Sequence, residues 1–295
     1  MKKASTPDTL PSTPPREITP DDIEKVFKTI TIPPCPAVVV DAMREAQKDM
    51  PDIARLSKTI SADVAMTAAT LKLANSPMFR GSAPIANVRR AIDRIGTLNV
   101  VCVVVAAALR QSIEGGSSAR MEQFWRQTSA LALAAGLIAH RHYGIPRDMA
   151  YLYALFHDIG IPLMATRFPA YDEAVRGGRD SGKLLVLTEA EYFPCTHPVI
   201  GWLTIRSWGL PDDLGTAVRY HHDPDVYDMP ETLVPDLSKS LMATVHVAEH
   251  LMAALVDDKD YEVGDPLFQR GLSHLGITQI DLEHLREEIN EVMDD

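Results

Sequence analysis

The chain has 295 residues, enough for one large domain or two modest ones, and 46% of them are hydrophobic. Its 29 Lys and Arg residues against 40 Asp and Glu residues give a formal net charge of −11. This excess of negative charge argues against a broad positive surface for phosphate backbones or anionic lipid, so we expect no nucleic-acid partner.

The first 20 residues contain five prolines and six Ser or Thr residues, and a segment of this composition buries little apolar surface. We therefore interpret residues 1–20 as a flexible leader. No apolar signal-peptide core follows the basic N-terminus. The longest apolar run, residues 98–109, falls short of the roughly 20 residues that a membrane-spanning helix needs. The sequence predicts a cytoplasmic protein that does not enter a membrane.

Proline signals typical of helix starts recur along the chain. They lie at Thr19-Pro20, Ser82-Ala83-Pro84, Ile145-Pro146, His197-Pro198 and Leu210-Pro211. Apolar side chains recur every three to four residues over 131–142 and 241–255, which indicates helices. The run Val100–Val105 could be a buried strand, but its apolar pattern continues to Leu109, a length that favours a helix.

These signals predict an all-α fold in two lobes. The first lobe covers about residues 21–116 and ends at the small-residue linker Gly115-Gly116-Ser117-Ser118. The second lobe covers about residues 119–256 and holds nearly all the histidines, so the helical domain as a whole spans 21–256. Residues 257–295 form a short acidic tail with one or two further helices.

Three groups of histidines and acids interrupt the apolar pattern of the second lobe. They are His157-Asp158, His197-Pro198 and His221-His222-Asp223. Gly160 and Pro162 should end the helix just after His157-Asp158 and leave these side chains at a helix end within the core. Imidazole and carboxylate groups are ligands for divalent first-row metals, although a buried hydrogen-bond network would use the same residues. Signature loops for dinucleotides, P-loops and α/β-hydrolases are absent from the sequence.

The segment His157-Asp158-Ile159-Gly160, followed by His197 and His221-His222, resembles the HD superfamily of metal-dependent phosphohydrolases. More specifically, the chain resembles the HDOD family of bacterial signalling proteins from about residue 25 to 255. The segments that carry this resemblance are Ile32-Pro33-Pro34-Cys35-Pro36, Ile60-Ser61-Ala62-Asp63, Leu71-Lys72-Leu73-Ala74-Asn75-Ser76-Pro77, Ala91-Ile92-Asp93-Arg94-Ile95-Gly96, Phe124-Trp125-Arg126-Gln127-Thr128-Ser129 and Trp208-Gly209-Leu210-Pro211. Within them, we expect Asn75 to cap a helix rather than bind a ligand.

The resemblance implies a site that departs from the pattern of active HD enzymes. Gln127 stands where such an enzyme carries its early metal-binding histidine, and a neutral amide is a poor ligand. Glu249 stands where the terminal aspartate is expected. A residual site for Fe, Mn, Zn or Mg would use six residues, among which Asp158 would be the catalytic one if the site were active. They are His157, Asp158, His197, His221, His222 and Glu249.

The segment His246-Val247-Ala248-Glu249-His250 also matches the HxxEH pattern of one class of zinc protease. This spacing is common in helices, and only 45 residues follow His250. We therefore interpret His246 and His250 as solvated side chains that flank Glu249.

The function that the resemblance implies is bacterial signal transduction through a degenerate HD site. In the first hypothesis the protein is not catalytic, and it acts by binding a protein partner of a signalling pathway or a nucleotide. In the alternative it is a metal-dependent phosphohydrolase that acts on a nucleotide or a cyclic dinucleotide.

Overall fold

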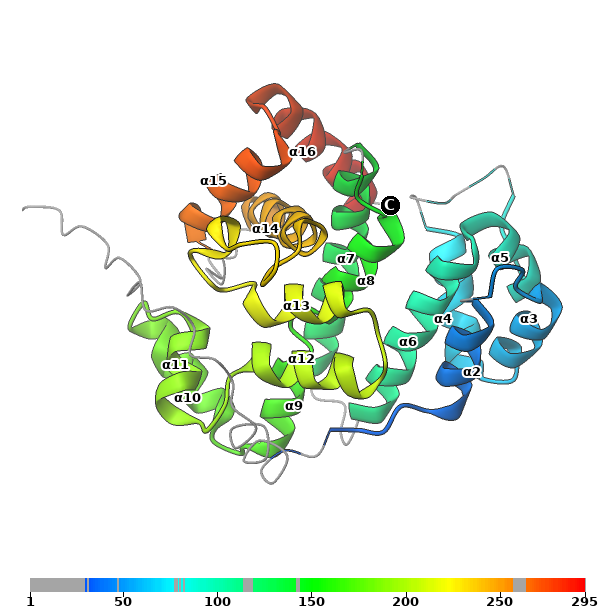
Figure 1. The fold of residues 1–295 in the computed structure, drawn as a ribbon, viewed down its shortest axis with the longest axis horizontal. Helices are drawn as coiled ribbons and strands as arrows, with labels where there is room; N and C mark the ends of the chain where they lie inside the picture. Colours follow the sequence, from blue (N-terminus) through cyan, green and yellow to red (C-terminus); the bar gives the residue numbers. More distant parts are fainter. Residues whose placement is uncertain are drawn as a thin grey trace, which may run out of the picture.

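The computed structural model describes residues 30, 32–46, 48–76, 79, 81, 83–113, 119–141, 144–256 and 264–294. All regular structure within these residues is helical, which confirms the all-α prediction (Figure 1). The predicted leader, the helix start at Thr19-Pro20 and the linker 115–118 lie outside the described residues. The predicted domain boundaries therefore stay predictions.

The first group of helices lies at one side of the molecule and leads into a long connecting helix (Figure 1). It comprises α2 (Ala37–Ala46), α3 (Ile53–Ser61), α4 (Val64–Ala74), α5 (Val88–Ile95) and the connecting helix α6 (Thr97–Ile113). The larger group comprises α7 (Ala119–Arg141), α8 (Arg147–Phe156), α9 (Gly160–Arg167), α10 (Tyr171–Asp180), α11 (Leu185–Tyr192), α12 (His197–Ser207), α13 (Asp212–Tyr220), η1 (Val226–Asp228) and α14 (Asp236–Val256). Two helices follow, α15 (Gly264–Leu275) and α16 (Gln279–Asp294).

Short polar side chains define the ends of the first helices. Asp63 caps the start of α4 by accepting a hydrogen bond from Met66 N at 2.8 Å. Asn75 caps the end of α4, as expected, and its side chain also exchanges two hydrogen bonds with the backbone of Ile85. The helix start predicted at Ser82-Ala83-Pro84 is wrong. The next helix, α5, begins at Val88, because Asn87 is the residue whose side chain caps it.

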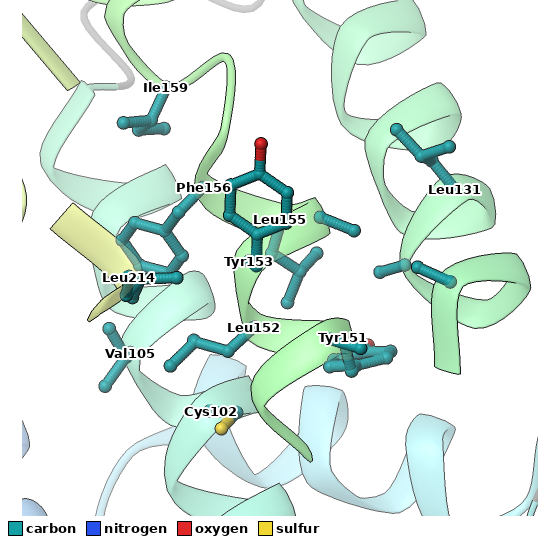
Figure 2. Close-up of a cluster of buried hydrophobic side chains, with 14 of the residues drawn as sticks. Cys102, Val105, Leu131, Tyr151, Leu152, Tyr153, Leu155, Phe156, Ile159 and Leu214 are labelled. Carbon is teal, nitrogen blue, oxygen red and sulfur yellow. The ribbon is translucent and has the colours of Figure 1, made fainter. Parts of the chain in front are cut away.

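The apolar run from Val100 onwards is a helix, not a strand, and it connects the two groups. Helix α6 packs against α2, α4 and α5 on one side and against α8 on the other. A helix covered on several sides is apolar around much of its circumference. Figure 2 shows Cys102 and Val105 of α6 beside the buried side chains of Leu152 and Phe156 of α8.

Proline marks three of the helix starts that position the histidines. Pro146 and Pro211 immediately precede α8 and α13, and Pro198 lies in the first turn of α12. These three predictions are confirmed. Helix α8 ends at Phe156, and α9 starts at Gly160 after a tight turn that contains His157 and Asp158. No helix in the described part of the chain is long and apolar enough to cross a bilayer.

Candidate metal centre

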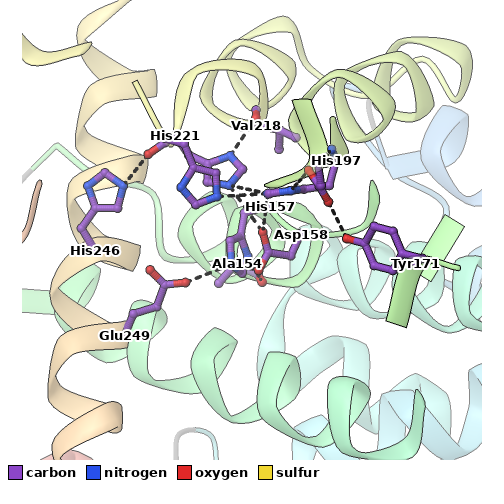
Figure 3. A network of polar contacts seen from close by, with 11 residues as sticks. Ala154, His157, Asp158, Tyr171, His197, Val218, His221, His246 and Glu249 are labelled. Atoms are coloured by element: carbon purple, nitrogen blue, oxygen red, sulfur yellow. Dashed lines mark hydrogen bonds and ion pairs between the residues drawn. The ribbon is translucent and has the colours of Figure 1, made fainter. Parts of the chain in front are cut away.

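The six residues implied by the resemblance come together in the structure, although four separate chain segments supply them (Figure 3). His157 and Asp158 follow the last residue of α8, and His197 is the first residue of α12. His221 and His222 follow α13, while Glu249 projects from α14. Five of these six side chains therefore lie at helix ends, where the chain changes direction and side chains converge.

Three imidazole rings and one carboxylate form the first part of this centre. The Nε2 atom of His197 lies 3.0 Å from Nε2 of His222 and 3.3 Å from Nε2 of His221. The Oδ1 atom of Asp158 lies 3.4 Å from Nε2 of both His197 and His221. These four side chains can all offer an atom to one cation.

The second part of the centre is richer in oxygen. The Nε2 atom of His157 lies 3.1 Å from Oδ2 of Asp158 and 3.1 Å from Oε1 of Glu249. Asp158 therefore belongs to both parts, with Oδ1 directed to one and Oδ2 to the other. A carboxylate in this position can bridge two adjoining ions.

The outer nitrogens of three rings are held by hydrogen bonds that leave Nε2 free as a ligand. Nδ1 of His157 donates to the carbonyl of Ala154, and Nδ1 of His221 donates to the carbonyl of Val218, each at 2.8 Å. Nδ1 of His197 donates to Oε2 of Glu189 at 2.7 Å. Metal-bound histidines typically have such partners, which select the tautomer and orient the ring.

Several polar atoms converge inside the centre without a donor between them when the rings are neutral. With only Nδ1 protonated, the Nε2 lone pairs of His197 and His221 would face each other. Oδ1 of Asp158 and Oε2 of Glu249 are buried without a hydrogen-bond partner among the described residues. Buried lone pairs and carboxylate oxygens that converge in this way are costly unless a cation compensates them. The donor set therefore fits a divalent cation.

The electrostatics of the centre agree with this interpretation. Burial lowers the pKa of His157, but the carboxylates of Asp158 and Glu249 outweigh burial and hold this pKa well above its ordinary value. Burial and then the neighbouring rings of His221 and His197 hold the pKa of His222 well below its ordinary value. The acidic part therefore attracts positive charge, while the imidazole-rich part keeps His222 neutral and available as a ligand.

Gln127 does not join this cluster. Its side chain is exposed on α7, and it makes no hydrogen bond with the six residues in the described part of the chain. The neighbouring Trp125 and Thr128 are the buried residues of this turn. Helix α7 thus contributes no observed ligand at the position where active relatives are expected to carry one.

The interpretation of His246 and His250 as solvated side chains is wrong for His246. This ring is buried because α13 and α15 cover α14. It accepts a hydrogen bond from the hydroxyl of Tyr227 and donates one to the carbonyl of His221. His250 is half-buried and stacks on Phe268, with ring centroids 3.6 Å apart. The two histidines of the HxxEH pattern therefore have separate structural partners.

Sequence reasoning missed Glu189 and Tyr171, which lie behind His197, and it wrongly placed His246 in solvent. Glu189 lies two residues before the exposed Glu191 in the same short helix, and no spacing in the sequence distinguishes the two. Only the packing of α11 buries one carboxylate and leaves the other at the surface.

Comparison with known proteins agrees with the fold. The HDOD domain model matches residues 32–224, which is more than half of the chain, and the chain therefore belongs to the HDOD family. An HDOD domain protein of unknown function from Geobacter sulfurreducens has a similar structure, with a TM-score of 0.71, 19% identity and coverage of 92% of this chain and 93% of that one.

Two further relatives are informative. A Shewanella amazonensis protein, described only provisionally as a phosphohydrolase, has a TM-score of 0.68 at 21% identity, with 92% of this chain and 94% of that chain covered. An uncharacterised protein of Treponema pallidum is 22% identical over 246 residues, which are 78% of this chain. The match spans only 44% of that curated relative's length.

Proposed function

We propose that this chain is a signalling protein in which the HD-derived centre holds a divalent cation as part of its structure and does not hydrolyse a substrate. The protein acts through a protein partner of its pathway, with a nucleotide as the other class of ligand to be tested. Membership of the HDOD family supports the signalling role, and the negative net charge still argues against nucleic acid.

The observation that carries the non-catalytic proposal is the burial of the centre. The side chains of His197, His157 and Asp158 are 0%, 4% and 11% exposed, and that of Glu249 is 21% exposed. Hydrolysis at a metal needs an open coordination position that water and a phosphate ester can both reach. Groups this buried are better suited to hold an ion between helix ends than to admit a nucleotide.

The residues that would hold the ion differ in chemistry. His197, His221 and His222 supply nitrogen ligands, which favour Zn, Fe or Mn over Mg. His157 and Glu249 would hold a second ion, with Asp158 shared between the two. When bound, the ion supplies positive charge that compensates Asp158 and Glu249 and ties α8, α12, α13 and α14 together.

The test is the metal content of the untagged full chain, measured by mass spectrometry for the wild type, for Asp158→Ala and for the control Asp41→Ala. Asp41 is an exposed acid whose partner is Arg44. We expect about one to two equivalents of Fe, Mn or Zn in the wild type and the control, and their loss in Asp158→Ala. Folded wild type that takes up no metal would overturn the metal centre.

The second candidate, a phosphohydrolase for nucleotides or cyclic dinucleotides, is favoured by the bridging position of Asp158 between two groups of ligands. It is tested by incubating the metal-loaded protein with nucleoside phosphates and cyclic dinucleotides. Turnover that Asp158→Ala abolishes would replace the non-catalytic proposal, whereas binding without turnover would support it.

A further inference from the structure

Behind the centre, three fully buried side chains are linked by hydrogen bonds. They are Tyr171, Glu189 and His197. Oε2 of Glu189 accepts hydrogen bonds from the backbone N of His197 at 2.8 Å and from its ring Nδ1 at 2.7 Å. Oε1 of the same carboxylate accepts a hydrogen bond from the hydroxyl of Tyr171. Figure 3 shows Tyr171 and His197 on the side of the centre opposite Glu249 and His246.

We propose that Glu189 is a positioning residue of the metal centre, and that Tyr171 holds its carboxylate in place. This inference rests on the proposed function, because it takes the ion to be bound by His197. Glu189 keeps the proton of His197 on Nδ1, directs Nε2 towards Asp158 and makes Nε2 a stronger electron donor. Ordinary metal-bound histidines with a carboxylate behind them show the same effect.

The contrast with the other rings supports this role. His157 and His221 donate Nδ1 to neutral backbone carbonyls one turn earlier in their own helices. Only His197, among these three, has a carboxylate behind it, and that carboxylate comes from a different helix. An ionised partner gives a stronger hydrogen bond and more electron density at Nε2 than a neutral carbonyl does.

The surroundings of Glu189 also indicate that its charge has a role beyond capping the start of α12. The backbone hydrogen bond to His197 satisfies one free N–H at the start of α12, and a neutral side chain could do that as well. Glu189 is 0% exposed, and its one ion-pair partner in the described part of the chain is His197. A carboxylate buried without Lys or Arg is costly. A cation on the far side of His197 compensates that charge.

Close packing of α10 against α11 holds Glu189 in register. A Cβ atom at Gly178 of α10 would lie 2.2 Å from Oγ1 of Thr188, the residue before Glu189. Phe193, just after α11, packs against Tyr171 with ring centroids 5.4 Å apart. The carboxylate is thus presented to His197 by a closely packed pair of helices.

Glu189→Gln separates the positioning role from a structural one. The amide oxygen can still accept from both nitrogens of His197, so the shape and the helix cap are kept while the charge is removed. The matched control is Glu191→Gln, which removes an exposed carboxylate of the same helix that pairs with Lys183. Affinity for Zn²⁺ is measured by competition with a chelator, and Co²⁺ absorption spectra report the ligand field directly.

Without metal, we expect Glu189→Gln to unfold at or above the wild-type temperature, because the buried charge is gone. It should bind Zn²⁺ about 10- to 100-fold more weakly, with altered Co²⁺ bands. Glu191→Gln should match the wild type. Wild-type affinity and spectrum in Glu189→Gln would overturn the positioning role and leave the metal centre intact. If the wild type binds neither Zn²⁺ nor Co²⁺, the proposed function itself fails and the positioning role with it.

If Glu189→Gln does not fold, the Tyr171→Phe variant tests the positioning role instead. It keeps the buried ring and removes only the hydroxyl that orients Oε1 of Glu189. A weaker Zn²⁺ affinity and shifted Co²⁺ bands in a folded Tyr171→Phe variant would support the positioning role. Unchanged affinity and spectrum would overturn it.

Discussion

Gly160 lies directly against the backbone of His197. A Cβ atom at position 160 would come within 2.1 Å of the His197 carbonyl oxygen and 2.7 Å of its carbonyl carbon. Real atoms do not approach so closely, so the start of α9 can pack on the start of α12 only if residue 160 is glycine. Asp158 lies two residues before Gly160, so this contact places the His197 ring next to the Asp158 carboxylate.

Gly160→Ala should therefore destabilise the protein by about 1–3 kcal/mol or more, because backbone atoms must move apart. Metal affinity should fall in the same variant, because His197 moves with α12. Urea unfolding measures the first effect and chelator competition the second. Gly177→Ala in α10 is the control, since a Cβ atom there meets nothing within 4 Å. It should stabilise the protein by about 0.5–1 kcal/mol. Equal stability of the two variants would contradict this explanation.

Asn75→Ala should lower the free energy of unfolding by more than the loss of an ordinary helix cap does. The Asn75 side chain donates to the carbonyls of Leu71 and Ile85 and accepts from Ile85 N. Its removal leaves the Ile85 backbone groups without these partners, at a cost of about 1–3 kcal/mol. Asn87→Ala, which removes the single exposed cap of α5, should cost about 1 kcal/mol. Denaturant titrations of both variants compare the two, and a larger loss in Asn87→Ala would refute the bridging role.

The buried His246 should make stability depend on pH. Burial, followed by the effect of His221, lowers its pKa to about 3, whereas an unfolded histidine titrates near about 6.5. The unfolded chain thus binds the proton more readily between these values. The stabilisation by neutral His246 is complete above about pH 6.5 and is lost as the pH falls towards 3.

Replacing His246 with Gln removes this titration while keeping a donor for the carbonyl of His221. With a metal chelator present, the wild type should lose about 2 kcal/mol more unfolding free energy than His246→Gln between pH 7 and pH 5. His284→Gln, at an exposed position on α16, is the control. Identical pH slopes for the wild type and His246→Gln would show that His246 is not buried as a neutral ring.

Arg270 of α15 should restrain the segment that follows His221 and His222. Its guanidinium donates to the carbonyl of Pro224 at 2.6 Å, pairs with Asp228 and lies over the ring of Tyr227. Arg270→Ala should speed amide hydrogen exchange in residues 223–229 and cost about 1–2 kcal/mol. The exposed pair of Arg44 with Asp41 provides a control, since Arg44→Ala should change stability by less than about 0.5 kcal/mol. Unchanged exchange in Arg270→Ala would mean that α15 does not hold this segment.

The sequence by itself determined the helical class and the starts of α8, α12 and α13, and it predicted the six residues that meet at the candidate centre. Each of these depends on local information. Proline ends or begins a helix wherever it stands, apolar periodicity reports the buried face, and the chemistry of His157 or Asp158 does not depend on the fold. The resemblance to the HDOD family could be recognised for the same reason, because its motifs are contiguous segments.

Only the tertiary structure decided which side chains lie behind these candidate ligands. Glu189 and Glu191 are alike in sequence, yet the packing of α11 buries the first behind His197 and leaves the second at the surface with Lys183. His246 is buried because α13 and α15 cover it, and Gln127 is exposed because its turn of α7 buries Trp125 and Thr128 instead. Burial and long-range hydrogen bonding depend on which helix lies opposite, and that partner is far away along the chain.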